Sequence, residues 1–361
     1  MILLNLPAFA ESNIPFVTRL RTSASDKRDI ADSLMIDADS MGASFAGAHG
    51  LFAIDGVSAE DLDGDVVLVT PLAGRAERLL RRASRHNTLL VTERCDQLCV
   101  MCSQPPKKTH VDRFALLEQA CLLAEPDTLI GVSGGEPTLY KQKLLSMIEH
   151  VLDARPDVQF HILSNGQHFE RDDVDRLRDP RYRRVSWGIP LYAADAATHD
   201  DVVGKHGAFV RLRDSFALLM AAGARVELRT VLLSTNVDKL HDLAHFVVAR
   251  LRFIEAWSIM QLEHIGFAKG RWRDLFVRHD LNFTPVATAL DAALLHGVRA
   301  QLFNFPLCTV PAAYRPYAIA SISDWKNKTM APCQQCSERE HCAGFFEWHP
   351  DEDAMAVVTP L

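Results

Sequence analysis

Three cysteines lie close together in the segment that reads ERCDQLCVMCS, residues 93–103. Cys95, Cys99 and Cys102 form the pattern C-x3-C-x2-C, which lets three thiolates point at one centre. A structural zinc ion takes four ligands, commonly from paired C-x2-C motifs, and this segment offers no histidine or fourth cysteine nearby. Three thiolates can instead hold an iron–sulfur cube with one open iron. We weigh that hypothesis against a structural metal loop and against chance spacing, because a motif alone does not prove a site.

A second group of cysteines occurs late in the sequence. Cys333, Cys336 and Cys342 form C-x2-C-x5-C, and Cys308 precedes the first of them by 25 residues. Four thiolates complete a tetrahedral zinc site, and they equally complete the ligation of an iron–sulfur cluster. The spacing alone therefore leaves both kinds of site open. Cys121 stands apart in the helix-like run RFALLEQACLLAEP, where we expect a small buried core residue.

A glycine-rich turn reads GGEPT, and its first four residues are Gly134, Gly135, Glu136 and Pro137. Glycine has no Cβ and lets the main chain approach a ligand closely, while Glu136 adds a carboxylate beside that bare backbone. Taken by itself, the stretch also fits a simple turn followed by a helix start. Its place, one strand-and-helix unit after the cysteine loop, favours a shared site.

Apolar runs typical of strands alternate with amphipathic runs typical of helices over residues 87–297. Six strand-then-helix units can be distinguished, which predicts an α/β fold with a parallel sheet and helices outside it. Six units are too few for a closed eightfold barrel, so we expect an open, partial (β/α)6 barrel of the TIM type. The strand-like runs are 87–92, 127–133, 158–164, 183–191, 224–234 and 253–262. The cysteine loop and GGEPT each follow a strand, at the end where such barrels carry their chemistry.

The first 85 residues have a different pattern, with short apolar runs between Gly, Asp and Ser turns. We expect a small β-rich domain, whose first strand lies in MILLNLPAFA, because that run has no basic n-region of a signal peptide. The arginine-rich run AGRAERLLRRASRH, residues 73–86, is expected to be helical. An exposed strand edge in this domain could pair with an extended peptide through main-chain hydrogen bonds.

Composition argues against several classes of partner. The chain has 39 Lys and Arg against 46 Asp and Glu, a net charge of -7, which argues against a general nucleic-acid binder. No run of 18 apolar residues occurs, so no membrane partner is expected. A large chain with eight cysteines and no export signal is expected to keep its thiols reduced, in the cytoplasm.

The order, spacing and strand context of these motifs resemble the radical S-adenosylmethionine (SAM) enzymes over residues 87–297. The resemblance implies that Cys95, Cys99 and Cys102 bind a [4Fe-4S] cluster whose fourth iron is chelated by SAM. It also implies that Glu136 holds the SAM amino group. The other cofactor-binding residues that it implies are Gly134, Gly135, Pro137, Ser164, Asn165, Arg229, Leu262 and Met101.

Several of these positions carry particular expectations. Met101 replaces the aromatic residue usual in the family and should pack under the cluster or the adenine. Arg229 is expected to meet the SAM carboxylate, although a buried strand arginine could instead form a core ion pair. Leu262, at the end of the sixth strand, should run past the adenine. Tyr192 and Glu263 are candidates at the barrel mouth, and no general acid or base is assigned.

The late cysteines resemble a shortened auxiliary-cluster domain of peptide-modifying radical SAM enzymes. This resemblance implies a second [4Fe-4S] cluster ligated by Cys308, Cys333, Cys336 and Cys342, with zinc as the alternative. The expected plan is therefore a β-rich N-terminal domain over 1–85, the barrel over 86–297, and a C-terminal cysteine-rich auxiliary iron–sulfur region over 298–361.

Within that group, three runs resemble the HxsC-type maturase of His-Xaa-Ser repeat systems: HNTLLVTERCDQLCVMCSQPPKK, WGIPLY and CQQCSEREHCAGFF. The likeness implies an enzyme that cleaves SAM reductively to a 5′-deoxyadenosyl radical and modifies a ribosomally made precursor peptide. It implies three partners, which are a precursor peptide with His-Xaa-Ser repeats, a partner radical SAM maturase and a cellular one-electron donor. The alternatives are a radical SAM enzyme acting on a small metabolite in cofactor biosynthesis and a non-enzymatic iron–sulfur electron carrier.

Overall fold

The computed structural model describes residues 2–23 and 29–361. The chain divides into two compact units. The first comprises residues 1–92, 111–133 and 140–161, and the second comprises residues 93–110, 134–139 and 162–361. Both cysteine groups and the GGEPT turn belong to the second unit, which therefore contains every predicted site residue.

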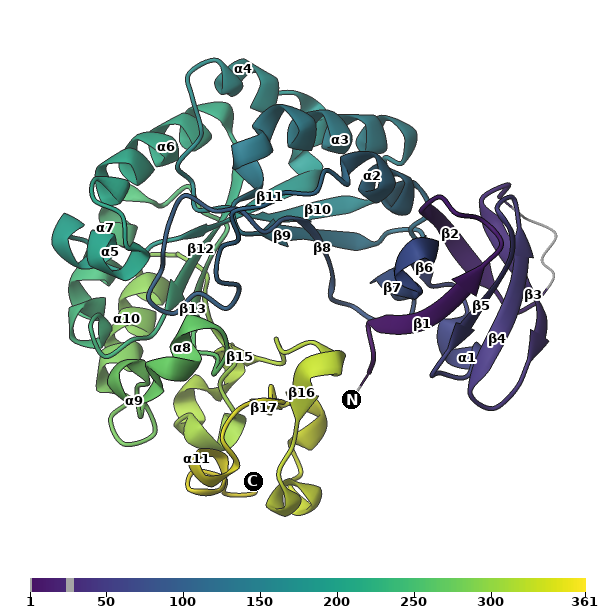
Figure 1. Ribbon diagram of the computed structural model, residues 1–361. Helices are drawn as coiled ribbons and strands as arrows, with labels where there is room; N and C mark the ends of the chain where they lie inside the picture. The colour runs from purple at the N-terminus through teal and green to yellow at the C-terminus, as the bar shows by residue number, and fades with distance from the viewer. Residues whose placement is uncertain (1, 24–28) are drawn as a thin grey trace. The chain divides into compact units, whose positions relative to one another are not determined.

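Strands β8 to β15 form one eight-stranded sheet whose spatial order, β15-β14-β13-β12-β11-β10-β9-β8, follows the order of the chain (Figure 1). Neighbouring strands from β11 to β15 are parallel. The bounds are β8 Asn87–Thr92, β9 Leu129–Gly134, β10 Gln159–Leu163, β11 Val185–Pro190, β12 Arg225–Val231, β13 Ala256–Met260, β14 Ala300–Phe303 and β15 Ala318–Ile319. The predicted α/β fold is confirmed, and β14 and β15 extend the six expected strands.

Helices alternate with these strands, as the sequence periodicity predicts. Helix α3 buries Leu144, Ile148 and Val151 on one face, a spacing of three to four residues that suits a helix packed on a sheet. The bounds are α2 Phe114–Leu122, α3 Lys141–Ala154, α4 Asp173–Leu177, α5 Ala196–Val203, α6 Ala208–Ala222, α7 Leu240–Arg250, α8 Phe267–Gly270, α9 Trp272–Leu275 and α10 Thr284–Leu295.

The N-terminal part of the first unit is a closed β-barrel with strand order β1-β5-β4-β3-β2-β6-β7 (purple in Figure 1). Buried residues alternate with exposed ones along β1, and the core of the barrel includes Leu20, Phe45, Phe52 and Ile54. The bounds are β1 Asn5–Ala10, β2 Phe16–Arg21, β3 Asp32–Ala38, β4 Gly42–Gly47, β5 Gly50–Asp55, α1 Ala59–Leu62, β6 Val66–Thr70 and β7 Arg75–Leu80. The expected β-rich region and its first strand are confirmed.

Two expectations for this region are wrong. Residues 75–80 form strand β7 and not a helix, because their alternate residues Ala76 and Arg78 face the barrel interior and pairing with β1 and β6 closes the barrel. Arg78 is buried there with Asp65, at 2.5 Å between Nε and Oδ2. The expected exposed strand edge is also wrong, because each of the seven described strands is paired on both sides and a closed barrel has no edge.

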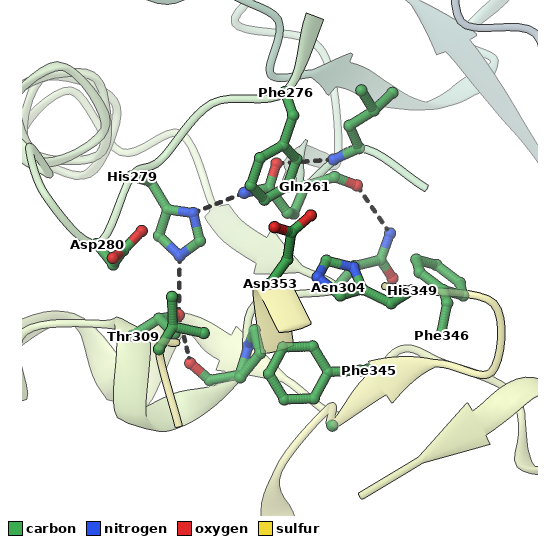
Figure 2. Close-up of a pocket in the computed structure, with 14 residues that line it drawn as sticks. Gln261, Phe276, His279, Asp280, Asn304, Thr309, Phe345, Phe346, His349 and Asp353 are labelled. Carbon is green, nitrogen blue, oxygen red and sulfur yellow. Dashed lines mark hydrogen bonds between the residues drawn. The ribbon is translucent and has the colours of Figure 1, made fainter. Parts of the chain in front are cut away.

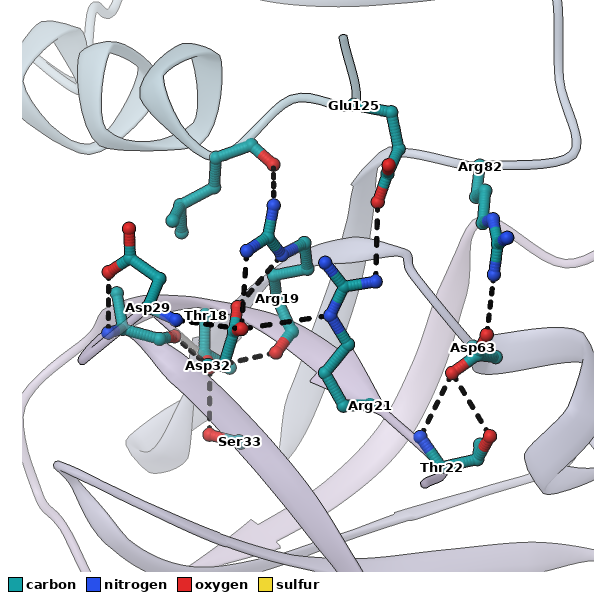
Figure 3. A network of polar contacts seen from close by, with 12 residues as sticks. Thr18, Arg19, Arg21, Thr22, Asp29, Asp32, Ser33, Asp63, Arg82 and Glu125 are labelled. Carbon is teal, nitrogen blue, oxygen red and sulfur yellow. Dashed lines mark hydrogen bonds and ion pairs between the residues drawn. The ribbon is translucent and has the colours of Figure 1, made fainter. Parts of the chain in front are cut away.

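Polar contacts hold the barrel to helix α2 and the segment after it within the first unit (Figure 3). Arg19 pairs with Asp32 and donates from Nη1 to the carbonyl oxygen of Leu123 at 3.3 Å. Arg21 reaches Glu125, with 3.4 Å between Nη1 and Oε1. The compact unit that contains the barrel therefore extends beyond residue 85 and includes α2 and α3.

The C-terminal part of the second unit consists of short elements around the late cysteines. A two-stranded antiparallel ribbon pairs β16, Asn327–Lys328, with β17, Phe345–Phe346, and helix α11 spans Asp351–Met355. Short 3-10 turns cover Leu307–Thr309, Ala331–Gln335 and Arg339–His341. In the described parts of the chain, every helix is too short or too polar to cross a bilayer.

Candidate functional site

Main-chain hydrogen bonds hold the early cysteine loop in place within the second unit. The loop amides of Leu98 and Val100 donate to the carbonyl oxygens of Val203 and Val202, at the end of α5, over 3.0 and 2.9 Å. The amide of Phe267, at the start of α8, donates to the carbonyl oxygen of Cys102 over 2.9 Å. The loop between the first and third cysteines is therefore fixed by two separate elements of the fold.

The three thiols of this loop lie close enough to influence one another electrostatically. Burial, together with charges on Glu136, Asp96 and Cys102, raises the pKa of Cys95 to about 11. Burial, together with the charges of ionised Cys102 and Cys95, raises the pKa of Cys99 to about 12. A cluster of iron ions supplies the positive charge that offsets this repulsion, because metal ligation requires the thiolate form. The donor set fits the expected cluster.

The GGEPT turn packs directly against the start of the cysteine loop. The amide of Glu136 donates to the carbonyl oxygen of Arg94 over 2.7 Å. A Cβ on Gly135 would stand 2.2 Å from that same oxygen, which no side chain can tolerate. Gly135 is thus required for the close approach of two protein backbones, which brings the turn beside Cys95.

The carboxylate of Glu136 is fully buried and accepts hydrogen bonds from four protein donors. Its Oε1 accepts from the Thr138 amide at 2.8 Å, from the Ser164 hydroxyl at 2.8 Å, and from the Thr138 hydroxyl. Its Oε2 accepts from the Asn165 amide at 2.5 Å. Burial raises the pKa of Glu136 despite these donors. The structure thus brings Glu136, Ser164 and Asn165 together, with the carboxylate acting as the tie between the turn after β9 and the turn after β10.

Asp96, the residue after Cys95, connects the cysteine loop to two other elements. Its Oδ1 accepts from Asn165 Nδ2 at 2.8 Å, its Oδ2 contacts Lys205 Nζ, and His168 Nε2 lies 3.3 Å from Oδ2. Burial alone would raise the pKa of Asp96, but the hydrogen bonds from His168, Lys205 and Asn165 hold it well below its ordinary range. Sequence reasoning missed this residue, and its position between two cysteines was the available signal.

We expect Asp96→Asn to loosen the cysteine loop. The amide keeps the size of the side chain but loses the charge that Lys205 pairs with, and a hydrogen bond to a charged group contributes about 1.5–3 kcal/mol. Iron at the early site should therefore be removed by a chelator roughly tenfold faster or more, since 1.4 kcal/mol corresponds to a factor of ten. The matched control is Asp201→Asn, which removes the same charge from an exposed position of α5. Equal release from both variants would contradict this role for Asp96.

An apolar cluster joins the cysteine loop to the end of β13. Met101, Tyr192 and Leu262 are buried in it, and Cys99 packs against it. Burial and the nearby Cys99 charge raise the pKa of Tyr192 well above its ordinary value. Two of the residues predicted to border SAM, Met101 and Leu262, thus share one surface with the cysteine loop.

Arg229 lies on β12, where its Nη1 donates to Glu227 Oε2 over 2.9 Å and its guanidinium stands 5.9 Å from the centre of the Phe303 ring. Ser258 donates to the other oxygen of the same carboxylate. This is the core ion pair that the sequence left as the alternative to a SAM contact. The contact between Arg229 and the SAM carboxylate remains a proposal.

Glu263, next to Leu262, lies at the packing surface of the C-terminal part. Its Oε1 is 3.6 Å from Lys326 Nζ, and that ammonium lies 4.9 Å from the centre of the Phe346 ring. Burial raises the pKa of Glu263, although Lys326 and Trp348 favour its charged form. Glu263 therefore contacts the region of the late cysteines.

The four late cysteines line one small pocket, together with Gly344, Phe345 and neighbouring residues. Backbone amides point at two of their sulfurs: Leu307 and Gly344 donate to Cys342 Sγ over 3.3 and 3.4 Å, and Leu361 donates to Cys336 Sγ over 3.4 Å. Hydrogen bonds from backbone amides to sulfur are a feature by which proteins stabilise and tune metal-bound thiolates. The four sulfurs and their donors fit a fully ligated metal centre.

Among residues 2–23 and 29–361, no three Cys, His, Asp or Glu side chains are grouped so as to hold a metal ion.

Part of the chain is similar to known proteins. Residues 89–247 match the family model described as the Radical SAM superfamily. A PqqA peptide cyclase from Methylocella silvestris is 24% identical over 164 residues, which cover 44% of this chain and 43% of that protein. Less than half of that relative is therefore matched.

Two solved structures align with part of the chain at low similarity. Streptococcus suis SuiB aligns over 60% of this chain and 48% of its own, with a TM-score of 0.46 and 15% identity. The enzyme anSMEcpe, with bound AdoMet and the peptide Cp18Cys, aligns over 60% and 62%, with a TM-score of 0.47 and 13% identity. The matched segment, residues 89–247, contains the cysteine loop and the GGEPT turn, so the similarity to the Radical SAM superfamily covers both motifs.

Proposed function

We propose that this protein is a radical SAM maturase that modifies a ribosomally made precursor peptide. The observation that carries the proposal is the convergence, within one compact unit, of the cysteine loop, the Glu136 turn and the end of β13. A ferredoxin-like electron carrier would need the thiols but not the other two elements. When bound, the cluster and SAM supply a reductive cleavage that generates a radical able to take hydrogen from carbon.

The residues of this chain have distinct tasks in the proposal. Cys95, Cys99 and Cys102 ligate the cluster, and the main-chain contacts of Leu98, Val100 and Phe267 hold that loop in position. Glu136 orders the turns after β9 and β10, and its carboxylate would hold the SAM amino group. Met101 and Leu262 provide an apolar surface from which water is excluded. Leu262 would border the adenine, and its amide donates to Gln261 Oε1 at 2.8 Å, which fixes the main chain at this position.

The peptide class of the substrate is supported by the relative whose name states a peptide as its substrate, the PqqA peptide cyclase. The runs that resemble HxsC-type maturases favour, within this proposal, a precursor with His-Xaa-Ser repeats, a partner maturase and a one-electron donor. The late cysteines hold an auxiliary [4Fe-4S] cluster in this proposal. A small metabolite as substrate is the competing function.

The test is anaerobic reconstitution of the full chain, followed by an assay for 5′-deoxyadenosine and for the mass of an added peptide. A precursor with His-Xaa-Ser repeats should stimulate SAM cleavage and change in mass, while a scrambled peptide of the same composition should do neither. If a small metabolite is consumed with SAM and the peptide is left unchanged, the maturase proposal fails, although the radical SAM chemistry stands.

A further inference from the structure

A hydrogen-bond network of three buried side chains connects the end of β13 to the turn that carries Cys308. Figure 2 shows its members: Gln261 follows β13, His279 lies on the segment before α10, and Thr309 directly follows Cys308. The cavity that they border, with a volume of about 30 Å³, is too small for a substrate side chain, because a single water already requires about 10–15 Å³. The network therefore belongs to the packed interior of the protein and does not line a substrate pocket.

Two backbone groups, one hydrogen-bond donor and one acceptor, fix the orientation of the Gln261 side-chain amide. Its Oε1 accepts from the amide of Leu262 at 2.8 Å, and its Nε2 donates to the carbonyl oxygen of Val277 at 3.0 Å. A flipped amide would place Oε1 against a carbonyl and Nε2 against an N–H. The second hydrogen of Nε2 is thus available to His279 alone, whose Nδ1 lies 2.6 Å away.

This orientation determines the tautomer of His279. Because Gln261 donates, His279 Nδ1 must accept, and the ring proton must therefore be on Nε2. Nε2 lies 2.8 Å from Thr309 Oγ1, and that hydroxyl donates its own hydrogen to the carbonyl oxygen of Pro306 at 2.7 Å. Thr309 Oγ1 therefore accepts a hydrogen bond from the His279 ring. Each hydrogen bond of the network thus has an assigned donor and an assigned acceptor.

The surroundings keep the ring neutral and in place. His279 is 4% exposed, and its ring packs edge-on against Phe305 with 4.6 Å between centroids. Burial lowers the pKa of His279 to about 4, although the neighbouring Asp280 alone would raise it. At neutral pH the neutral imidazole thus accepts one hydrogen bond, from Gln261 at Nδ1, and donates one, from Nε2 to Thr309.

We infer that His279 is a positioning residue that fixes the Cys308 turn against the end of β13, so that Cys308 is held ready for a metal at the late cysteine site. The inference rests on the proposal that these cysteines bind metal. It extends that proposal, because the strength of metal binding then depends on a hydrogen-bond network whose residues are not themselves metal ligands. Thr309 connects the network to the turn, because its hydroxyl contacts both the His279 ring and the carbonyl oxygen of Pro306.

The test uses the full chain with Cys95, Cys99 and Cys102 replaced by alanine, so that only the late site is read. One arm is loaded with iron and sulfide and the other with Zn²⁺ alone, and release to a chelator is followed. Thr309→Val keeps the shape but offers no acceptor to His279 Nε2, and it should release metal at least tenfold faster. Thr309→Ser restores the hydroxyl and should behave as the parent, a rescue that a merely space-filling role of Thr309 would not predict.

Two further variants sharpen the result. Thr288→Val makes the same exchange on α10, at a residue that lines neither the cysteine pocket nor the cavity beside His279, and it should leave release unchanged. His279→Gln keeps one acceptor and one donor and should retain metal better than His279→Leu. If Thr309→Val releases metal at the parental rate, the positioning role is overturned while the late metal site stands. If the parent holds neither iron–sulfur nor zinc there, the late site itself fails, and the inference fails with it.

Discussion

Replacing Cys95, Cys99 and Cys102 together by alanine should abolish SAM cleavage and lower the iron content of the reconstituted protein from about eight to about four atoms per chain, by the stoichiometry of two [4Fe-4S] clusters. Loss of activity should be complete because these thiolates are the only protein ligands proposed for the early cluster. Each single replacement should likewise remove cleavage. The measurements are iron and sulfide content and the yield of 5′-deoxyadenosine after anaerobic reconstitution.

The control for this prediction is Cys121→Ala. Cys121 is fully buried in helix α2 and its thiol serves the core, so iron content and cleavage should both persist. A triple variant that still cleaves SAM would remove the basis of the proposed function. A parent protein with about four irons and one zinc would instead show that the late cysteines bind zinc, and would leave the early site as assigned.

Glu136→Ala should affect two quantities at once. If the SAM amino group binds at this carboxylate, affinity for SAM should fall by about 1.5–3 kcal/mol, the range for a hydrogen bond to a charged group. The protein should also lose stability, because the amides of Thr138 and Asn165 and the hydroxyl of Ser164 lose their buried acceptor. Each buried donor left without a partner costs about 1–3 kcal/mol. Denaturant unfolding and calorimetric SAM titration measure the two effects.

Thr138→Val, which removes the hydroxyl donor to Glu136, separates these effects. It removes one of the four donors to Glu136 but leaves the carboxylate in place, so stability should fall modestly while SAM affinity changes little. Iron at the early site should survive in both variants, since no ligand is altered. A folded Glu136→Ala protein that binds SAM as tightly as the parent would contradict the SAM contact and leave Glu136 as the tie between the two turns alone.

The strand and helix order of the sheet could be predicted because its strands are continuous apolar runs with regular spacing. Strand β7 could not, since the buried Arg78 interrupts the apolar alternation and the run of arginine, leucine and alanine favours a helix locally. Its strand conformation is set by pairing with β1 and β6 and by the ion pair with Asp65. Tertiary contacts overrode local preference.

The candidate site was predictable where its chemistry lies in short motifs. Each of two such motifs lies within eight residues of sequence, Cys95 to Cys102 and Gly134 to Pro137, so each can be recognised without the fold. Asp96 and His279 could not be recognised in this way, because their partners are distant in the chain: Asp96 contacts residues 69 and 109 positions away, and His279 meets Thr309 30 positions later. Only the folded chain places these groups together.

Closure of the N-terminal barrel has a consequence for how its outer surface can evolve. The main chain of β1 to β7 is committed to pairing between strands, so any molecule that meets this barrel is recognised by side chains and loops. Outward-facing residues such as Phe9, Ile36 and Leu51 can then be exchanged without altering a single strand pairing. A new specificity on this surface would be acquired by point substitutions, with the scaffold unchanged.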